Sequence, residues 1–126
     1  MIEVPLYITL PRKTKKDKKY YLNLNNYRNW HYIVSNQIKH KFCENLEEQL
    51  NGLKFNKVDI TYTLYKGSKR KVDRANVLCI IEKFFCDALT FYGCLPDDSD
   101  DYIEATHYYS KYDKGHPRCE IEIKEL

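Results

Sequence analysis

The sequence predicts a small α+β domain in which two main helices pack against one small mixed β-sheet. Segments with alternating apolar and polar residues are typical of half-buried strands, and two segments carry apolar residues at the spacing of amphipathic helices. The order of these segments is strand, helix, strand, helix, strand, strand, which places helices against a mixed sheet. At 126 residues, the chain fits one domain spanning residues 1–126, without repeat or linker.

The strands are predicted from alternation and from turn residues. Apolar residues partly alternate over residues 3–10, and Pro11 ends this strand because proline has no N–H to donate. Residues 58–64 alternate apolar side chains with aspartate and threonine. Residues 102–109 and 119–123 are two further strands, separated by a polar turn with glycine and proline.

Two helices are predicted from apolar periodicity. The first covers residues 28–50 and ends at Asn51 and Gly52, with Trp30 and Phe42 in its core-facing stripe. The second follows Asp73, which occupies the N-cap position, and ends before Gly93. Its wide apolar face comprises Val77, Leu78, Ile80, Ile81, Phe84, Phe85, Ala88 and Leu89. Both helices therefore have a face to bury.

Several classes of protein are not expected. The chain has no apolar run long enough to cross a bilayer and no signal-peptide pattern at its start, so we expect a cytoplasmic protein without membrane contact. The five cysteines form no C-x-x-C pair. We expect reduced, mostly buried thiols rather than a disulfide framework or a zinc site.

Charged residues are clustered, although the net charge is only +3. Basic residues are concentrated within residues 12–19 and again within residues 66–74, and acidic residues within 97–104. Two basic stretches and one acidic cluster fit a surface that binds a polyanion and a divalent metal ion. Solvated lysine-rich loops explain the same pattern equally well.

The segment 69–76 places the carboxylate of Asp73 and the amide of Asn76 at the first turn of the second predicted helix. Asp73 can accept hydrogen bonds from the free N–H groups of that turn, a capping role worth about 1 kcal/mol. Alternatively, its carboxylate faces a cleft and binds a divalent cation. Considered alone, the position favours the cap.

The segment 93–101 places Asp97, Asp98, Asp100 and Asp101 in one turn. Carboxylates this close repel one another and are stabilised by a cation or by solvent. Mg²⁺ typically takes one or two carboxylates together with phosphate oxygens. An exposed acidic turn is the alternative, and the spacing is not that of an EF-hand loop.

The ordered set of these features resembles the signature of RusA-like Holliday-junction resolvases, endodeoxyribonucleases of the phage and prophage type. In that family, Asp-x-Asp-Asn opens a helix containing Lys-x-x-x-Asp-Ala-Leu, followed by glycine and an Asp-Asp pair. Here the matching residues are Asp73, Asn76, Lys83, Asp87, Ala88, Leu89, Gly93, Asp97 and Asp98. The Asn-rich segment 23–28 also resembles the part of such proteins that precedes their first helix, so the likeness spans nearly the whole chain.

The resemblance implies a set of site residues. Asp73, Asp98 and Lys83 match catalytic positions, and Asp73, Asp98 and the neighbouring Asp97 match metal-binding positions. The DNA-binding residues that it implies are Lys69, Arg70, Lys71, Arg74 and Asn76. The implied cofactor is Mg²⁺, with Mn²⁺ as an alternative, and no organic cofactor is expected.

Two departures from the family pattern bear on the site. Ala75 stands where the second aspartate is expected. The interval from Asn76 to Lys83 is longer than in the family by about one helical turn, which moves Lys83 by about 6 Å along the helix. Glu82 and Asp87 lie far along the helix from Asp73, so we favour Asp97, ahead of Asp100, as the replacement ligand.

Asp87 is predicted to make a structural hydrogen bond or salt bridge near the helix end.

The resemblance implies a Mg²⁺-dependent endonuclease that resolves four-way junctions and other branched DNA by paired symmetric hydrolysis, acting as a homodimer. The alternative is a branched-DNA-binding protein of the same fold that has lost cleavage, since Ala75 removes a carboxylate. A third possibility is a protein-interaction domain with no preference for junctions.

Aromatic residues are numerous, with 12 tyrosines. They are interpreted either as cover for strands and dimer interfaces or as platforms for unpaired bases. The tyrosines considered for base stacking are Tyr20, Tyr21, Tyr27, Tyr32, Tyr108 and Tyr109.

Overall fold

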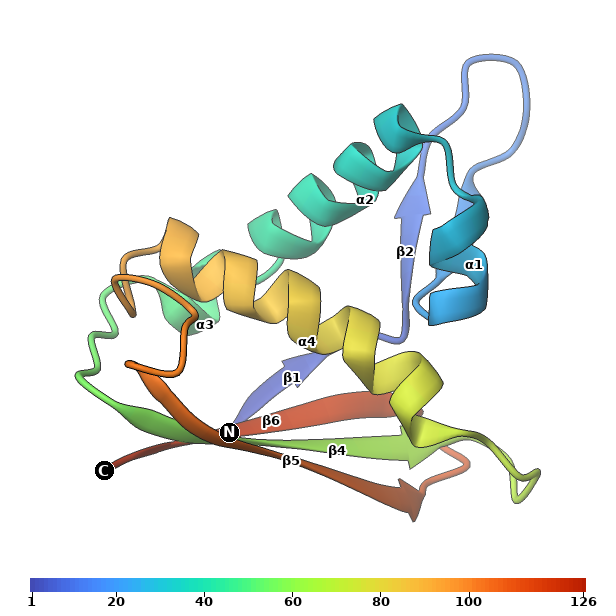
Figure 1. Ribbon diagram of the computed structural model, residues 1–126. Helices are drawn as coiled ribbons and strands as arrows, with labels where there is room; N and C mark the ends of the chain where they lie inside the picture. The colour runs from blue at the N-terminus through green and yellow to red at the C-terminus, as the bar shows by residue number, and fades with distance from the viewer.

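The fold consists of six strands and four helices in a computed structural model that describes residues 1–126 (Figure 1). The strands are β1 (Ile2–Val4), β2 (Tyr7–Leu10), β3 (Lys18–Tyr21), β4 (Val58–Lys66), β5 (Ile103–Tyr112) and β6 (Arg118–Glu125). The helices are α1 (Leu24–Asn29), α2 (Tyr32–Glu44), α3 (Glu47–Leu50) and α4 (Arg74–Phe91).

A mixed four-stranded sheet forms the base of the molecule. Its strand order is β1-β6-β4-β5, with β4 and β5 parallel and the other pairs antiparallel. Helix α4 makes the crossover between the two parallel strands and lies across one face of the sheet, while no helix covers the other face (Figure 1). The predicted α+β class with a mixed sheet is therefore confirmed.

The core lies between this sheet and the helices. On β4, Ile60, Tyr62 and Leu64 are buried, and the residues between them are only half-buried, as period-two alternation predicts. Helix α4 buries eight residues, among them Phe84 and Phe85. The ring of Phe84 lies 5.7 Å from that of Phe42 on α2, which joins the two main helices.

The first predicted strand is divided in two, and a strand was missed. β1 pairs with β6, whereas β2 turns away from the sheet and pairs with β3 in a separate hairpin. The basic segment 12–19 was predicted to be a loop, but its last two residues begin β3. In the structure, Lys18 lies over the ring of Tyr20 at 5.0 Å and Lys19 over that of Tyr7 at 4.6 Å. These cation–π contacts let a lysine-rich segment form a strand.

The first predicted helix is three helices rather than one. Its backbone leaves the helical region at Trp30, which has ψ 134°, and α2 starts after His31, whose Nδ1 accepts a hydrogen bond from the N–H of Ile33. A second break separates α2 from α3 at Asn45 and Leu46. The break at Trp30 leaves this side chain half-buried, although the prediction placed it in the core, whereas Phe42 is fully buried as predicted.

All five cysteines are free, and Cys86, Cys94 and Cys119 are buried, as expected for reduced thiols. None of the helices combines the length and the apolar character needed to cross a membrane.

Candidate active site

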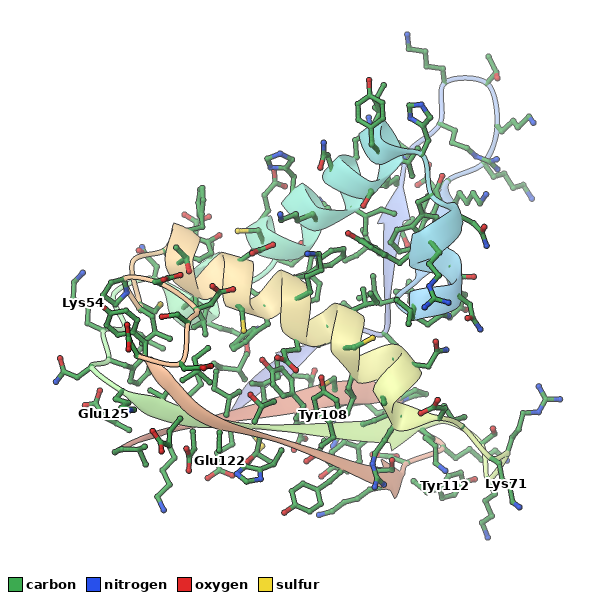
Figure 2. The ribbon with its side chains drawn as sticks, in the orientation of Figure 1. Lys54, Lys71, Tyr108, Tyr112, Glu122 and Glu125 are labelled. Atoms are coloured by element: carbon green, nitrogen blue, oxygen red, sulfur yellow. The ribbon has the colours of Figure 1, made fainter.

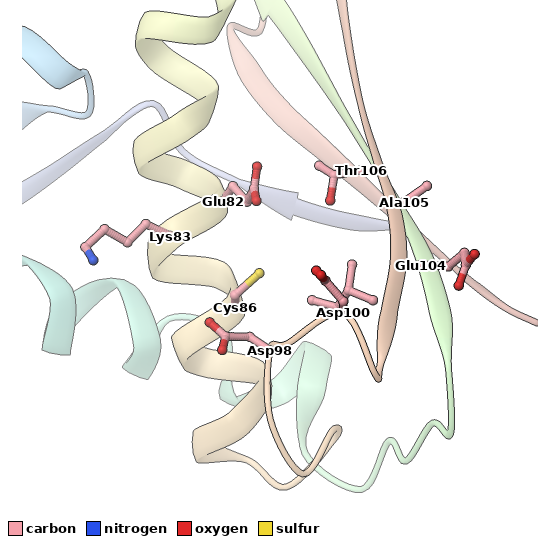
Figure 3. Close-up of a pocket in the computed structure, with 9 residues that line it drawn as sticks. Glu82, Lys83, Cys86, Asp98, Asp100, Glu104, Ala105 and Thr106 are labelled. Atoms are coloured by element: carbon pink, nitrogen blue, oxygen red, sulfur yellow. The ribbon is translucent and has the colours of Figure 1, made fainter.

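A cavity of about 320 Å³ lies between the middle of α4 and the start of β5 (Figure 3). We call it the acidic cavity, because four of its lining residues are carboxylates. It is lined by Glu82, Lys83, Cys86, Asp98, Asp100, Ile103, Glu104, Ala105 and Thr106. Two residues named from the sequence, Asp98 and Lys83, thus line one cavity together with Glu82, which the sequence argument had set aside.

The path of the chain after α4 creates this arrangement. Gly93 has a φ of +71°, a conformation that favours glycine, and it reverses the chain at the helix end. The returning segment is held by hydrogen bonds from the N–H of Cys94 to Leu89 O, 2.8 Å, and from the N–H of Tyr102 to Ser99 O, 3.0 Å. Asp98 and Asp100 are thereby brought back against the flank of α4.

Three of the four carboxylates of the acidic cavity have no cationic partner, whereas Glu104 forms a salt bridge with Lys57 at 2.8 Å. Glu82 accepts a hydrogen bond from the hydroxyl of Tyr108, and the carboxylates of Asp98 and Asp100 form no hydrogen bond or ion pair with the protein. Burial raises the pKa of Cys86 to about 12, and the charges of Glu82 and Asp98 add to that increase. The Cys86 thiol is therefore protonated at neutral pH and is unsuited to act as a nucleophile.

Asp73 lies away from this cavity. It caps α4, and its Oδ1 accepts a hydrogen bond from the N–H of Ala75 at 3.1 Å. At a rise of about 1.5 Å per residue, Asp73 lies about 14 Å from Glu82 and about 20 Å from Cys86 along the helix axis. Asp73 therefore lies apart from Asp98, which lines the acidic cavity together with Glu82 and Cys86 from the middle of the helix that Asp73 starts.

Asp97 faces a different part of the molecule. It lines a larger cavity, about 700 Å³, between α2 and α4, which Asp98 also lines from its edge. Asp97 Oδ1 accepts a hydrogen bond from the N–H of Asp98 at 2.7 Å. Asp87 lines the same larger cavity and forms a salt bridge with Lys39 at 2.8 Å. The predicted structural role of Asp87 is confirmed, and Asp97 is not in the acidic cavity.

Lys83 contributes the aliphatic part of its side chain, rather than its charged group, to the lining of the acidic cavity. Figure 3 shows its ammonium group on the opposite side of α4 from the Glu82 carboxylate. Lys83 is exposed and forms no salt bridge, so its side chain is free to turn. Its direction does not bring its charge to the carboxylates of the acidic cavity.

The loop between β4 and α4, residues 67–73, carries the second group of predicted residues. Lys69, Arg70 and Lys71 are exposed on it, Arg74 is exposed in the first turn of α4, and Asn76 is half-buried in the same turn. We call residues 67–73 the basic loop. Figure 2 shows Lys71 at the same end of the sheet as Tyr112, and Lys69 lies over the Tyr112 ring at 5.6 Å.

The basic loop and the acidic cavity are separated along the sheet. Thr106 lines the cavity and pairs with Ile60, whereas Tyr112 pairs with Lys66 at the start of the basic loop. Six residues of strand span about 20 Å. A ligand that contacts both regions at once must therefore be an extended polyanion.

Carboxylates that could accept a divalent cation are present, but they are not gathered around one point. No three His, Cys, Asp or Glu side chains lie close enough together to hold a metal ion. Mg²⁺ usually keeps several waters and takes one or two carboxylates along with substrate phosphates. Glu82, Asp98 and Asp100 supply oxygen donors of the type that this chemistry uses, from the lining of one cavity.

A comparison with protein-family models found no match for this sequence, and a comparison with curated proteins found none either. The function must therefore be argued from the residues of the acidic cavity and the basic loop.

Proposed function

We propose that this protein is a metal-dependent endodeoxyribonuclease of the RusA-like type that resolves four-way junctions and other branched DNA. One observation carries the proposal. Asp98, a residue singled out by the RusA-like pattern, lines the acidic cavity together with the carboxylates of Glu82 and Asp100. The carboxylate oxygens of this site are ligands of the type that hard divalent cations prefer.

Asp98, Glu82 and Asp100 would hold Mg²⁺ or Mn²⁺ in this proposal. The ion would supply Lewis-acid polarisation of a phosphate and a lowered pKa of an attacking water. The protein itself orients the carboxylates, through the Tyr108–Glu82 hydrogen bond and the turn at Gly93. Lys83 can turn toward the scissile phosphate and neutralise part of its charge.

DNA binding is assigned to the cations of the basic loop, with Arg74 and Asn76 at the start of α4. The distance of about 20 Å between the basic loop and the acidic cavity corresponds to about six nucleotides at 3.4 Å per nucleotide along one strand. The basic loop therefore contacts backbone phosphates away from the scissile one, a positioning role that carries no base specificity.

A homodimer completes this proposal, because resolving a junction requires two symmetric nicks. One acidic cavity per subunit provides one nick, and a twofold axis between two copies matches the symmetry of the junction.

A protein of this kind that binds junctions without cutting them is the second candidate. Two observations favour it. Ala75 replaces an expected carboxylate, and Asp73 is engaged in capping α4 far from Asp98.

Nicking of a labelled four-way junction, compared with matched linear duplex in Mg²⁺ or Mn²⁺, tests the proposal. Paired nicks in the junction alone are expected from the wild type, with at least a hundredfold loss in Asp98→Asn and Glu82→Gln, since each removes charge at the site where the ion acts. Asp101→Asn is the matched control, because Asp101 is exposed in the same turn but does not line the acidic cavity.

Junction binding without nicking in either ion supports the second candidate. Equal affinity for junction and duplex, with no nicking, contradicts both candidates and leaves the protein-interaction domain.

A further inference from the structure

An aromatic hollow of about 540 Å³ lies at the break between α1 and α2, apart from the acidic cavity. It is lined by Leu24, Tyr27, Arg28, Trp30, Tyr32, Ser35 and Asn36. Three flat rings, a guanidinium, a hydroxyl and an amide therefore surround one space. Its volume is in the range of pockets that bind small organic groups.

The indole of Trp30 is held in place from two sides. Its ring lies 6.0 Å from Tyr20 of the β2–β3 hairpin and 6.0 Å from Tyr27 of α1, both edge-on. Tyr27 in turn contacts the buried ring of Phe84 on α4, at 6.2 Å. Edge-on contacts of this kind add to the packing energy and fix ring orientation. Trp30 is thus a rigid wall of the hollow, connected to the core.

Tyr32 provides a free ring on the other side of the break. Its side chain is 69% exposed, and its hydroxyl forms no hydrogen bond with the protein. His31 lies beside it, with ring centroids 4.6 Å apart at an interplanar angle of 31°. An exposed ring next to a fixed ring is the arrangement that proteins use to stack bases without sequence preference.

Cationic side chains lie both on the β2–β3 hairpin and at the hollow. Lys18 lies over the ring of Tyr20, which contacts Trp30, and Arg28 lines the hollow itself. The hairpin turn adds exposed cations at Arg12, Lys13, Lys15 and Lys16. The hairpin projects beside α1 and the start of α2 (Figure 1). A phosphate backbone that follows these cations would bring its bases to the hollow.

We propose that the aromatic hollow binds an unpaired base of a single-stranded DNA segment. Trp30 and Tyr32 stack on the base, Ser35 and Asn36 offer hydrogen bonds to its edge, and Arg28 with the hairpin cations binds the flanking phosphates. This inference rests on the proposed function, because single-stranded segments occur where DNA branches. It adds a second contact region, on helices α1 and α2 rather than on the sheet.

Trp30 is the only tryptophan in the chain, so its fluorescence reports on the hollow alone. Oligo(dT) labelled with a visible dye is titrated at low salt, with matched duplex in a parallel titration. Tryptophan emission measures occupancy of the hollow, and dye anisotropy measures binding anywhere on the protein. We expect saturable quenching by oligo(dT), at least fivefold weaker for duplex.

Tyr32→Ala should weaken the quenching titration roughly tenfold, the usual effect of removing one stacking ring. Arg28→Ala should weaken it severalfold and reduce its salt dependence. Phe91→Ala is the matched control, because Phe91 is an exposed aromatic residue of α4 that does not line the hollow. Circular dichroism spectra that match the wild type verify that each variant is folded.

An anisotropy rise without quenching would contradict base binding in the hollow, but it would not contradict the proposed function. Equal weakening by Tyr32→Ala and Phe91→Ala would also contradict base binding in the hollow. No anisotropy change with any DNA overturns both the hollow and the proposed function, whereas quenching without nicking supports the hollow and the non-cleaving candidate.

Discussion

Tyr108 on β5 donates a hydrogen bond from its hydroxyl to the carboxylate of Glu82 on α4, beside the acidic cavity. Burial and this hydrogen bond raise the pKa of Tyr108 well above its usual value, so the hydroxyl keeps its proton and remains a donor. The bond connects the edge strand of the sheet to the helix and fixes the direction of one cavity carboxylate.

Tyr108→Phe should lower the free energy of unfolding by about 1–2 kcal/mol, because it removes a hydrogen bond to a charged acceptor in a half-buried setting. Urea unfolding of the wild type and the variant measures this difference. Tyr109→Phe is the control, since the neighbouring hydroxyl is exposed and forms no hydrogen bond. Equal stabilities of wild type and Tyr108→Phe would show that the bond is not formed in solution.

Asp73 should behave as a helix cap rather than as a metal ligand. Asp73→Ala is expected to cost about 1 kcal/mol of unfolding free energy, whereas Asp73→Asn retains a capping oxygen and should cost only a few tenths. Because Asp73 lies far from Asp98, junction nicking by Asp73→Asn should stay within about threefold of the wild type. If Asp73→Asn is as stable as the wild type but cannot nick, the position implied by the RusA-like resemblance is the correct one.

The main elements of the fold could be predicted because their signals are local. The alternation on β4 and the apolar face of α4 follow from residues that are close in sequence. The β2–β3 pairing could not, because lysines at Lys18 and Lys19 are unusual in a strand and are accommodated by contacts with Tyr20 and Tyr7. The break at Trp30 could not be predicted, because the helical spacing of apolar residues continues across it.

The candidate site was predicted in part. Asp98 and Lys83 both line the acidic cavity, although the ammonium of Lys83 points away from the carboxylates, whereas Glu82 was not predicted because it lies far along α4 from Asp73. This distance matters only for a site at the start of the helix. The segment after Gly93 instead returns to the middle of α4, and such a long-range contact leaves no periodic signal in the sequence.

Lys71 should contribute to the salt dependence of junction binding. If its ammonium contacts one backbone phosphate, Lys71→Gln should reduce the slope of log K against log salt by about 0.9. Fluorescence anisotropy between about 50 and 200 mM salt provides the slope. Lys54→Gln removes the same charge at the opposite end of the molecule (Figure 2) and should leave the slope unchanged. Equal slopes for wild type and Lys71→Gln would exclude the basic loop from the DNA interface.

Alkaline pH should destabilise the protein through its buried thiols. Burial raises the pKa of Cys86 and of Cys119 from 9.0 to about 12. In the unfolded chain these thiols lose their protons near pH 9, while in the folded protein they keep them. The contribution of these protonated thiols to the free energy of unfolding is therefore fully present below pH 9. It is lost as the pH rises toward 12, by up to about 1.4 kcal/mol per pH unit for each thiol.

The decrease is measured by urea unfolding at several values between pH 8 and 10, under reducing conditions. Lysines titrate mostly above this window, whereas Tyr62, Tyr92 and Tyr108, whose pKa values burial also raises, add to the decrease as the pH approaches 10. Cys119→Ala removes one of the two thiols whose pKa is raised to about 12 and should make the slope shallower by less than half, because burial also raises the pKa of Cys43, Cys79 and Cys94. The constant cost of the small cavity that the substitution creates does not affect the slope. Cys43→Ala is the comparison at a half-buried thiol and should alter the slope less. A slope that is the same in wild type and Cys119→Ala would mean that this thiol ionises as readily in the folded protein as in the unfolded chain.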